Sequence, residues 1–409
     1  MQFNIRRASI MLDITMPLAV ILIFYPPCLA QYAGGLLPLV FLMQKGIFFL
    51  CVRYFISYKI FSSKYFIFMT GYVLWALLVT LLNGDSIGSA GNFLNLFSMG
   101  VITVFCIERN PCKYAGCIAA WFTLLLFFNT FLWQDGGMYV NSNGQASFVL
   151  GTKTSLTEYQ LAACFFICLY HYLLPGKKWK AVFLWVIMTV SLILWNVREP
   201  ITTSILCLIV FIGLLVWQTY ENRLVNTVLQ IGFWVLIAIN IGIVFFNVQM
   251  LFANFITNVL HENADLNHRT AIWKLVLARI TENPWIGFGL RSNIYFAVGS
   301  GVAGINQATH NGLLYFLFTT GIAGTAYLFA FYLAASICAG IKTVFGRLFH
   351  IIMICFATLW ISEQLKGYDI FFLCMLCGIY ISQWAKRQPS NQLDGNYSTM
   401  SESRGYGNE

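Results

Sequence analysis

Long apolar segments, separated by short polar breaks, fill most of the chain. Runs of about 16 to 25 apolar residues are long enough to cross a bilayer as helices. In lipid every backbone amide needs a partner within its own segment, so a spanning run has to be helical. The pattern predicts about twelve such helices. They are expected at 10–30, 36–56, 65–82, 93–107, 115–133, 158–174, 181–197, 201–218, 227–246, 310–340, 348–363 and 370–385.

The composition agrees with a polytopic membrane protein of the all-α class. Hydrophobic residues make up 59% of the chain and charged residues only 10%, and the mean hydropathy is +0.73. Soluble domains average about 25% charged residues. The first apolar run, Ile10 to Ala30, is too long for the apolar part of a signal peptide and has no evident small-residue cleavage site. We therefore expect this run to be the first membrane helix.

Lysine and arginine gather in alternate breaks between the predicted spans. If the N-terminus is cytoplasmic, the inner breaks hold most of these bases, as the positive-inside rule expects. The net charge of +9 then needs no nucleic-acid partner. An even number of spans, with both termini cytoplasmic, follows. The inner bases are Lys59, Lys64, Arg109, Lys113, Lys177, Lys178, Lys180, Arg223, Lys342, Arg347, Lys386 and Arg387.

One long polar interruption divides the chain. The expected organisation is a membrane domain at 1–246, a large extracytoplasmic loop at 247–309, C-terminal membrane helices at 310–385, and a polar cytoplasmic tail at 386–409 that is expected to be disordered. A chain that otherwise lies in the bilayer can place such an insertion only in water. We therefore expect the chemistry to involve this loop.

The loop contains a predicted surface helix from His268 to Ile280. Its apolar side chains recur at helical spacing, which predicts an amphipathic helix lying on the membrane face. The Asn-Pro pair at 283–284 ends the helix, and Gly287 and Gly289 allow a tight turn. The expected apolar stripe is Ile272, Leu275, Val276 and Ile280, with Trp273 alongside, and Arg269, Lys274 and Arg279 lie off it.

Arg198 is a candidate for anion binding. It is followed by Glu199 and by Pro200, which suits the first turn of a helix because its missing N–H would have no partner there. The helix expected at 201–218 would then present free N–H groups and a partial positive charge beside Arg198. An interfacial Arg198 paired with Glu199 is the alternative interpretation.

Arg269 and His310 are the other two candidates. Arg269 opens the predicted surface helix, and its permanently charged guanidinium can bind phosphate in a bidentate manner. A contact with lipid headgroups is the alternative. His310 stands at the outer start of a predicted span, where a helix N-terminus disfavours the charged imidazolium, so we expect a neutral ring that can accept a hydroxyl proton. A hydrogen bond to a loop carbonyl is the alternative.

The acidic residues of the expected outer loops are not spaced as metal ligands. Asp85, Asp135, Asp265 and Asp369 stand alone, so no DxD pair occurs there. We expect no metal and no cofactor. Arginines and helix dipoles would have to neutralise any pyrophosphate handled in this region.

The chain resembles the bacterial O-antigen polymerase and O-antigen ligase superfamily in two segments. They read NHRTAIWKLVLARITENPWIGFGL and THNGLLYFLFTTGIAG. The resemblance lies in an arginine with a bulky apolar residue four positions later, a Pro-x-x-Gly-x-Gly turn, and a His-Asn pair opening a membrane helix with a glycine eleven positions after the histidine. Arg198 fits a further arginine of the pattern. The usual Asn-Pro-Asn of the loop at 134–157 and the Arg-x10-Gly pattern of some polymerases are absent. The matching residues are Arg269, Trp273, Pro284, Gly287, Gly289, His310, Asn311 and Gly321.

This resemblance implies a glycosyltransferase of the GT-C type whose donor is an undecaprenyl-pyrophosphate-linked oligosaccharide at the outer face of the cytoplasmic (inner) membrane. In a polymerase the acceptor is the non-reducing end of another lipid-linked repeat unit. In a ligase it is lipid A core or another surface acceptor, and both interpretations stay open. A polysaccharide flippase or secondary transporter is the alternative of another class, and it would need two related halves. Membrane lipids, a flippase and a chain-length regulator are the expected partners.

In the implied reaction Arg198 and Arg269 bind the diphosphate, and His310 accepts or orients the proton of the attacking hydroxyl. The Gly-rich run at 297–304 would close over the sugars and exclude water. Glu199 or Glu363 would be the base if His310 only positions the acceptor. Further substrate contacts are expected from Lys153, Glu199, Trp273, Tyr295 and Asn311, with Tyr139 as another stacking surface.

Overall fold

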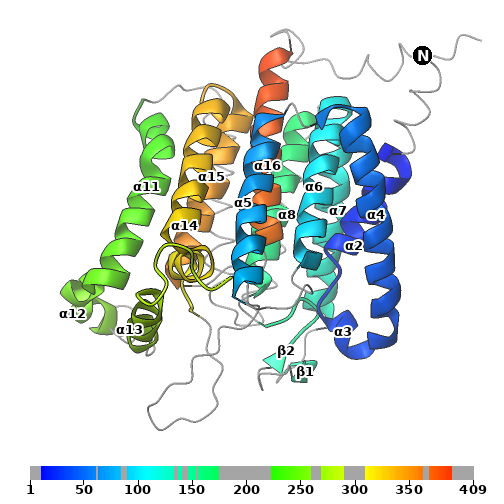
Figure 1. Ribbon diagram of the computed structural model, residues 1–409. Helices are drawn as coiled ribbons and strands as arrows, with labels where there is room; N and C mark the ends of the chain where they lie inside the picture. Colours follow the sequence, from blue (N-terminus) through cyan, green and yellow to red (C-terminus); the bar gives the residue numbers. More distant parts are fainter. Residues whose placement is uncertain are drawn as a thin grey trace, which may run out of the picture.

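The computed structural model in Figure 1 describes residues 11–60, 63–83, 90–132, 137–140, 146–152, 155–174, 223–258, 269–289, 309–362 and 368–388. Helices dominate these residues, as the sequence predicts. Two short strands, β1 (Tyr139–Val140) and β2 (Ala146–Ser147), pair antiparallel. The α-helices are α2 (Met16–Ile23), α3 (Cys28–Tyr32), α4 (Leu37–Ser57), α5 (Lys64–Leu82), α6 (Ala90–Arg109), α7 (Pro111–Phe131), α8 (Ser155–Leu173), α11 (Arg223–Phe246), α12 (Ala253–Asn258), α13 (Arg269–Ile280), α14 (Gly312–Ala339), α15 (Val344–Ser362) and α16 (Tyr368–Arg387).

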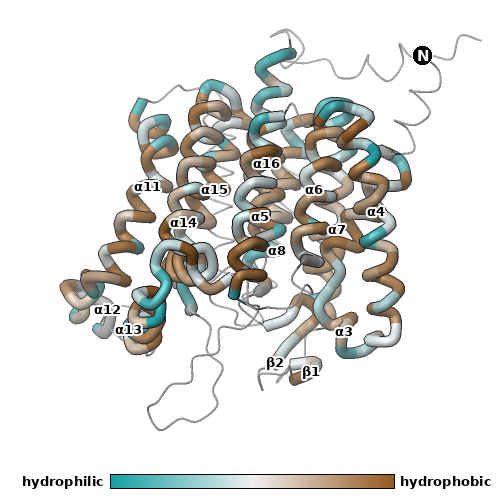
Figure 2. Tube along the Cα trace, viewed as in Figure 1, coloured by the Kyte–Doolittle hydropathy of each residue, from teal (hydrophilic) through white to brown (hydrophobic). Residues whose placement is uncertain are grey.

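The long helices lie side by side in a bundle, and α3, α12, α13 and the two strands gather at one end of it (Figure 1). We call this end the α13 end. The opposite end is the basic end, because several helices begin or finish there at basic residues; Figure 2 shows the hydrophilic tip of α16. Its basic residues include Lys59, Lys64, Arg109, Lys342 and Lys386.

Six of the described helices are long and apolar enough to cross a membrane, which indicates a multi-pass membrane protein. Helices also lie at the predicted spans 93–107, 158–174 and 370–385. The predicted spans 181–197 and 201–218 lie outside the described residues, so the full count of twelve stays a prediction. The six are Gly34–Ser57, Lys64–Leu82, Pro111–Phe131, Arg223–Phe246, Gly312–Ala339 and Val344–Ile361.

The prediction of one continuous helix over 10–30 is wrong. Helix α2 ends at Ile23, and the chain passes through Pro26 and Pro27 into the short α3. Proline lacks the N–H that a helix interior needs and clashes with the preceding turn. The N–H of Cys28 instead donates to the carbonyl of Val149, 3.2 Å away. The apolar residues around the two prolines concealed this break.

The predicted loop at 134–157 is partly regular. Tyr139 pairs with Ser147 in the β1–β2 hairpin, and the N–H of Leu150 donates to Asn129 Oδ1 at the end of α7, over 3.0 Å. This hairpin lies at the α13 end, where Figure 1 shows it near α3. Tyr139 is therefore at the same end of the bundle as α13.

Aromatic rings fix the position of α14 among its neighbours. The rings of Phe233 in α11 and Tyr332 in α14 stack with centroids 3.8 Å apart. Trp360 of α15 lies 5.0 Å from Phe316 of α14 and 5.3 Å from Phe371 of α16. Such ring pairs add to the burial of apolar surface. Helix α14 is thus packed against α11, α15 and α16, and its first residue is held at the α13 end.

Candidate functional site

Helix α13 packs through a face centred on Trp273. Trp273, Val276 and Ile280 are buried, and they fall on one side of a helix because they are spaced by three and four residues. The predicted stripe is wrong in one member: Leu275 is 41% exposed. It lies about 200° around the helix from Trp273 at 100° per residue. Trp273, which the prediction placed alongside the stripe, belongs to the buried face, and Leu275 does not.

The indole of Trp273 connects α13 to the segment before α14. Its Nε1–H donates to the carbonyl oxygen of Thr309 over 3.0 Å, and Trp273 is only 1% exposed. The Thr309 hydroxyl in turn donates to the carbonyl of Asn311, also over 3.0 Å. Trp273 therefore acts as a buried link, and its predicted role as a sugar-stacking surface stays a prediction.

The hydrogen bond from Trp273 to Thr309 joins the two segments that carry Arg269 and His310. Arg269 is the first residue of α13 and lies one turn before Trp273 on the same face of the helix. His310 directly follows Thr309, the residue that the indole binds. Both side chains are half-buried. Two of the three predicted catalytic residues, distant in sequence, are thus held at the same end of the bundle.

His310 has an unusual backbone conformation. Its φ angle is +46°, in the left-handed region that few residues other than glycine adopt. Such strain costs roughly 1–3 kcal/mol and persists only when the neighbouring structure determines it. Here Thr309 and Asn311, both 0% exposed, fix the chain on either side. The orientation of His310 is therefore imposed by its buried neighbours.

Asn311 caps α14 and joins three helices. Its Oδ1 accepts from the N–H of Leu314 over 3.0 Å, in the usual manner of an N-cap. Its Nδ2 donates to Asn240 Oδ1 in α11 over 2.7 Å and to the carbonyl of Ile361 in α15 over 3.3 Å. Asn311 thus donates both side-chain amide hydrogens to partners within the protein. Its predicted contact with substrate stays a prediction.

Asn240 was not predicted from the sequence. It is 0% exposed and belongs to the apolar helix α11. A polar side chain within a membrane helix usually joins that helix to another one. An asparagine inside the predicted span 227–246 was therefore the available signal, but nothing in the sequence indicated that Asn311 is its partner.

Helix α14 occupies the predicted span 310–340, but its regular hydrogen bonding is interrupted at Gly321, which the sequence did not predict. Gly321 has φ +66° and ψ −175°. Regular helix bonds would run from residues 322–324 back to the carbonyls of residues 318–320. Other donors occupy these carbonyls instead: Phe288 N–H donates to Phe318 and Gly289 N–H to Thr319, each over 2.8 Å, and the indole N–H of Trp75 donates to Thr320 over 3.1 Å.

The turn after α13 also provides hydrogen-bond acceptors for the N–H groups that follow the break in α14. The N–H of Ile322 donates to the carbonyl of Pro284 over 2.8 Å, and that of Ala323 donates to the carbonyl of Trp285 over 3.2 Å. We call this arrangement of residues 284–289 with 318–323 the Gly321 joint. It is built by the Pro-x-x-Gly-x-Gly turn of the sequence, whose contact with α14 no local pattern could reveal.

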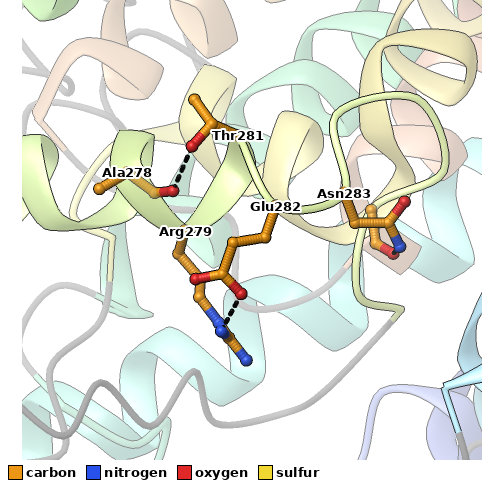
Figure 3. Close-up of polar contacts among 6 residues, drawn as sticks. Ala278, Arg279, Thr281, Glu282 and Asn283 are labelled. Atoms are coloured by element: carbon orange, nitrogen blue, oxygen red, sulfur yellow. Dashed lines mark hydrogen bonds and ion pairs between the residues drawn. The ribbon is translucent and has the colours of Figure 1, made fainter.

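The end of α13 is stabilised by local polar contacts, shown in Figure 3. Arg279 forms an ion pair with Glu282, and this hydrogen bond raises the pKa of the guanidinium. The Thr281 hydroxyl donates to the carbonyl of Ala278 over 2.6 Å. Asn283 Nδ2 donates to the carbonyl of Gly287 over 2.8 Å and so closes the turn. The exposed ion pair stabilises the protein little, but it gives Arg279 a partner in the turn that directly follows α13.

Several predicted site residues lie outside the part of the chain that the structure describes. These residues are Lys153, Arg198, Glu199, Tyr295 and Glu363. Their predicted roles stay predictions. Among the described residues, no group of three or more histidine, cysteine, aspartate or glutamate side chains could hold a metal ion.

Residues 183–329 match a family model described as O-antigen ligase. The matched range includes α11, α13, the Gly321 joint and the three predicted catalytic residues Arg198, Arg269 and His310. No curated protein matches the chain.

Proposed function

We propose that this chain, which the family match supports as a member of the O-antigen polymerase and ligase superfamily, polymerises a surface polysaccharide such as O-antigen or capsule. Members of the family are glycosyltransferase-like enzymes that act on lipid-linked glycans. In the proposed reaction, an undecaprenyl-pyrophosphate-linked oligosaccharide is transferred to the non-reducing end of another lipid-linked repeat unit. The observation that carries the proposal is the hydrogen bond from Trp273 to Thr309, which ties the helix that begins with Arg269 to the residue before His310.

Arg269 binds the diphosphate of the donor in this proposal, together with Arg198. When the acceptor hydroxyl attacks the anomeric carbon, the bond to the diphosphate breaks and negative charge grows on the leaving group. A guanidinium offers two parallel N–H donors to phosphate oxygens and stays charged at any physiological pH. Groups fixed in place before the reaction stabilise such charge most effectively. The position of Arg269 at the start of a helix that is anchored at Trp273 supports this role.

His310 accepts or orients the proton of the attacking hydroxyl in this proposal. A base at this step must reach the hydroxyl within hydrogen-bond distance, and a positioned histidine typically contributes about 10²- to 10⁴-fold in rate. The backbone of His310, held between buried Thr309 and Asn311, supports a fixed point from which the ring projects. The Gly-rich run at 297–304, which lies outside the described residues, is proposed to cover the sugars and exclude water.

The active site is proposed to face the outside of the cytoplasmic (inner) membrane. The positive-inside rule places the basic end of the bundle in the cytoplasm. The α13 end, with Arg269 and His310, then faces the opposite side. A flippase that delivers the lipid-linked units and a regulator of chain length are the proposed partners at that face.

A ligase reaction is the second candidate function, because the matched family model is described as O-antigen ligase. The same groups would serve it, since the donor diphosphate is identical and only the acceptor changes to lipid A core or another surface molecule.

Deletion of the protein, followed by sizing of the surface glycan, tests the proposal. A polymerase predicts that single repeat units remain attached to the surface anchor. Full-length polymer left on the lipid carrier instead identifies a ligase. An unchanged surface glycan in the deletion strain would contradict both functions, and restoring the full chain is the control.

A further inference from the structure

We propose that Gly287 and Gly321 are positioning residues, and that the Gly321 joint holds α13, with Arg269, in a fixed relation to His310. This inference rests on the proposed function of Arg269 and His310, and it assigns a role to a turn and a helix break that follow those two residues in the chain. It deepens the proposed function by naming what aligns the two groups.

Besides its buried face, α13 is attached by hydrogen bonds in two places, to the segment before α14 and to the first half of α14. One is the indole bond from Trp273 to Thr309, near the beginning of α13. The other is the joint, which begins four residues after the last residue of α13, Ile280. A helix fixed at a single point can pivot about it, whereas a helix fixed near both ends cannot. The joint therefore determines the direction of α13, and with it the place of Arg269.

The joint consists of four hydrogen bonds between main-chain groups. Two run from residues 288 and 289 to carbonyls of α14, and two run from residues 322 and 323 of α14 to carbonyls of the turn, all between 2.8 and 3.2 Å. These bonds satisfy groups that the break in α14 would leave without partners inside an apolar bundle, where such groups are costly. The break and the turn therefore form together or not at all.

Glycine is required where the two segments meet. A Cβ atom at Gly321 would lie 2.3 Å from the carbonyl oxygen of Trp285, and one at Gly287 would lie 2.5 Å from the backbone nitrogen of Gly321. Both residues also have positive φ angles, of 66° and 79°. Because the obstructing atoms belong to the backbone, a methyl group at either position has to push the turn away from α14.

The first test compares Gly321→Ala with Gly340→Ala. Gly340 follows the last residue of α14 and has a similar φ of +60°, but an added Cβ there would meet only Lys386 Nζ, at 3.6 Å. Purified full-length protein is examined by hydrogen exchange of peptides covering 283–289 and 318–323. We expect slow exchange in the wild type and in Gly340→Ala, and faster exchange in Gly321→Ala.

The same proteins are assayed for glycan transfer from a lipid-pyrophosphate-linked donor. A misplacement of about 1 Å can lower a rate about 10²-fold. We expect kcat of Gly321→Ala to fall by about that factor while KM for the donor changes little, because the diphosphate still reaches Arg269 in poor alignment. Gly340→Ala is expected to keep the wild-type kcat.

A milder pair of variants covers the case in which Gly321→Ala does not fold. Trp75→Phe keeps a ring in α5 but removes the donor to Thr320, 3.1 Å away in the joint. Trp121→Phe removes an equivalent donor to the carbonyl of Phe24, 3.0 Å away in another part of the bundle. We expect faster exchange at 318–323 and a lower kcat for Trp75→Phe only.

Wild-type kcat in a variant whose joint exchanges rapidly would overturn the inference. Wild-type exchange in both Gly321→Ala and Trp75→Phe would overturn it as well, because the added methyl group and the lost donor would then leave the joint intact. Failure of the proposed function has a different signature, namely a protected joint in the wild type with no glycan transfer by any protein, including Gly340→Ala. That result would contradict the proposed function of Arg269 and His310, on which the inference rests.

Discussion

At the scale of single residues, His310 combines a strained backbone with buried neighbours on both sides. The resemblance in sequence indicated the His-Asn pair, and the structure shows what each member does for the other. Asn311 caps α14 and fixes the chain, while His310 takes the left-handed conformation just before the cap. The strain itself could not be predicted, because the sign of φ at a histidine depends on partners such as Asn240 that are distant in sequence.

Replacing His310 with alanine is expected to abolish chain extension at an unchanged protein level. The loss of a positioned base corresponds to a fall of about 10²- to 10⁴-fold in kcat. The length distribution of the surface glycan, together with the amount of protein in the membrane, checks this expectation. Normal polymer in cells that carry this variant would remove His310 from the mechanism.

Arg269→Lys tests whether the guanidinium fork is needed. Lysine keeps the charge but cannot offer two parallel donors to phosphate, so we expect transfer to fall at least about tenfold. Arg279→Lys is the matched control, because Arg279 lies on the same helix, is exposed and pairs with Glu282. We expect the control to transfer at the wild-type rate. Equal activity of the two variants would show that a point charge suffices at position 269.

At the scale of elements, α13 and α14 show which features of a helix the local sequence pattern can predict. The sequence predicted the end of α13 to the residue, since the helix ends at Ile280. It predicted the inner face less well, because hydropathy ranks leucine above tryptophan, whereas Leu275 is 41% and Trp273 only 1% exposed. It missed the break at Gly321, because a glycine within an apolar run is compatible with a helix. The partners that stabilise the break come from the distant turn at 284–289.

Trp273→Phe tests the link between these two elements. Phenylalanine keeps an apolar ring but leaves the Thr309 carbonyl without its donor, which costs about 1–3 kcal/mol when the group is buried. We expect a lower unfolding temperature and a clear loss of transfer, because α13, which carries Arg269, is no longer tied to the residue before His310. Trp285→Phe is the control, since Trp285 is 66% exposed and contributes only its backbone to the joint. Transfer by Trp273→Phe protein at the control rate would show that the link does not position Arg269.

At the scale of the whole molecule, the account depends on which end of the bundle faces the cytoplasm. Charge in the loops predicted the orientation, and the helices place Lys59, Lys64, Arg109 and Lys386 together at the basic end. Apolar runs predicted where helices occur, but they could not reveal that Pro26 and Pro27 divide the first one, because hydropathy does not register a missing N–H.

Labelling of introduced cysteines in intact cells tests this orientation. Lys274→Cys lies on an exposed part of α13, and Lys342→Cys lies at the exposed basic end between α14 and α15. We expect a membrane-impermeant maleimide to label the first and not the second, and permeabilised cells to label both. The unsubstituted protein, with its own cysteines, gives the background. The reverse pattern of labelling would place Arg269 and His310 in the cytoplasm and contradict the proposed reaction.

The most direct test of the central claim is an experimental structure of the full chain bound to a non-transferable lipid-pyrophosphate-linked glycan. The account predicts diphosphate oxygens within about 3 Å of the Arg269 guanidinium nitrogens, as in charge-assisted hydrogen bonds, with His310 beside the anomeric carbon on the side open to the acceptor. A diphosphate bound at the basic end, or at the α13 end without contact to Arg269, would contradict it.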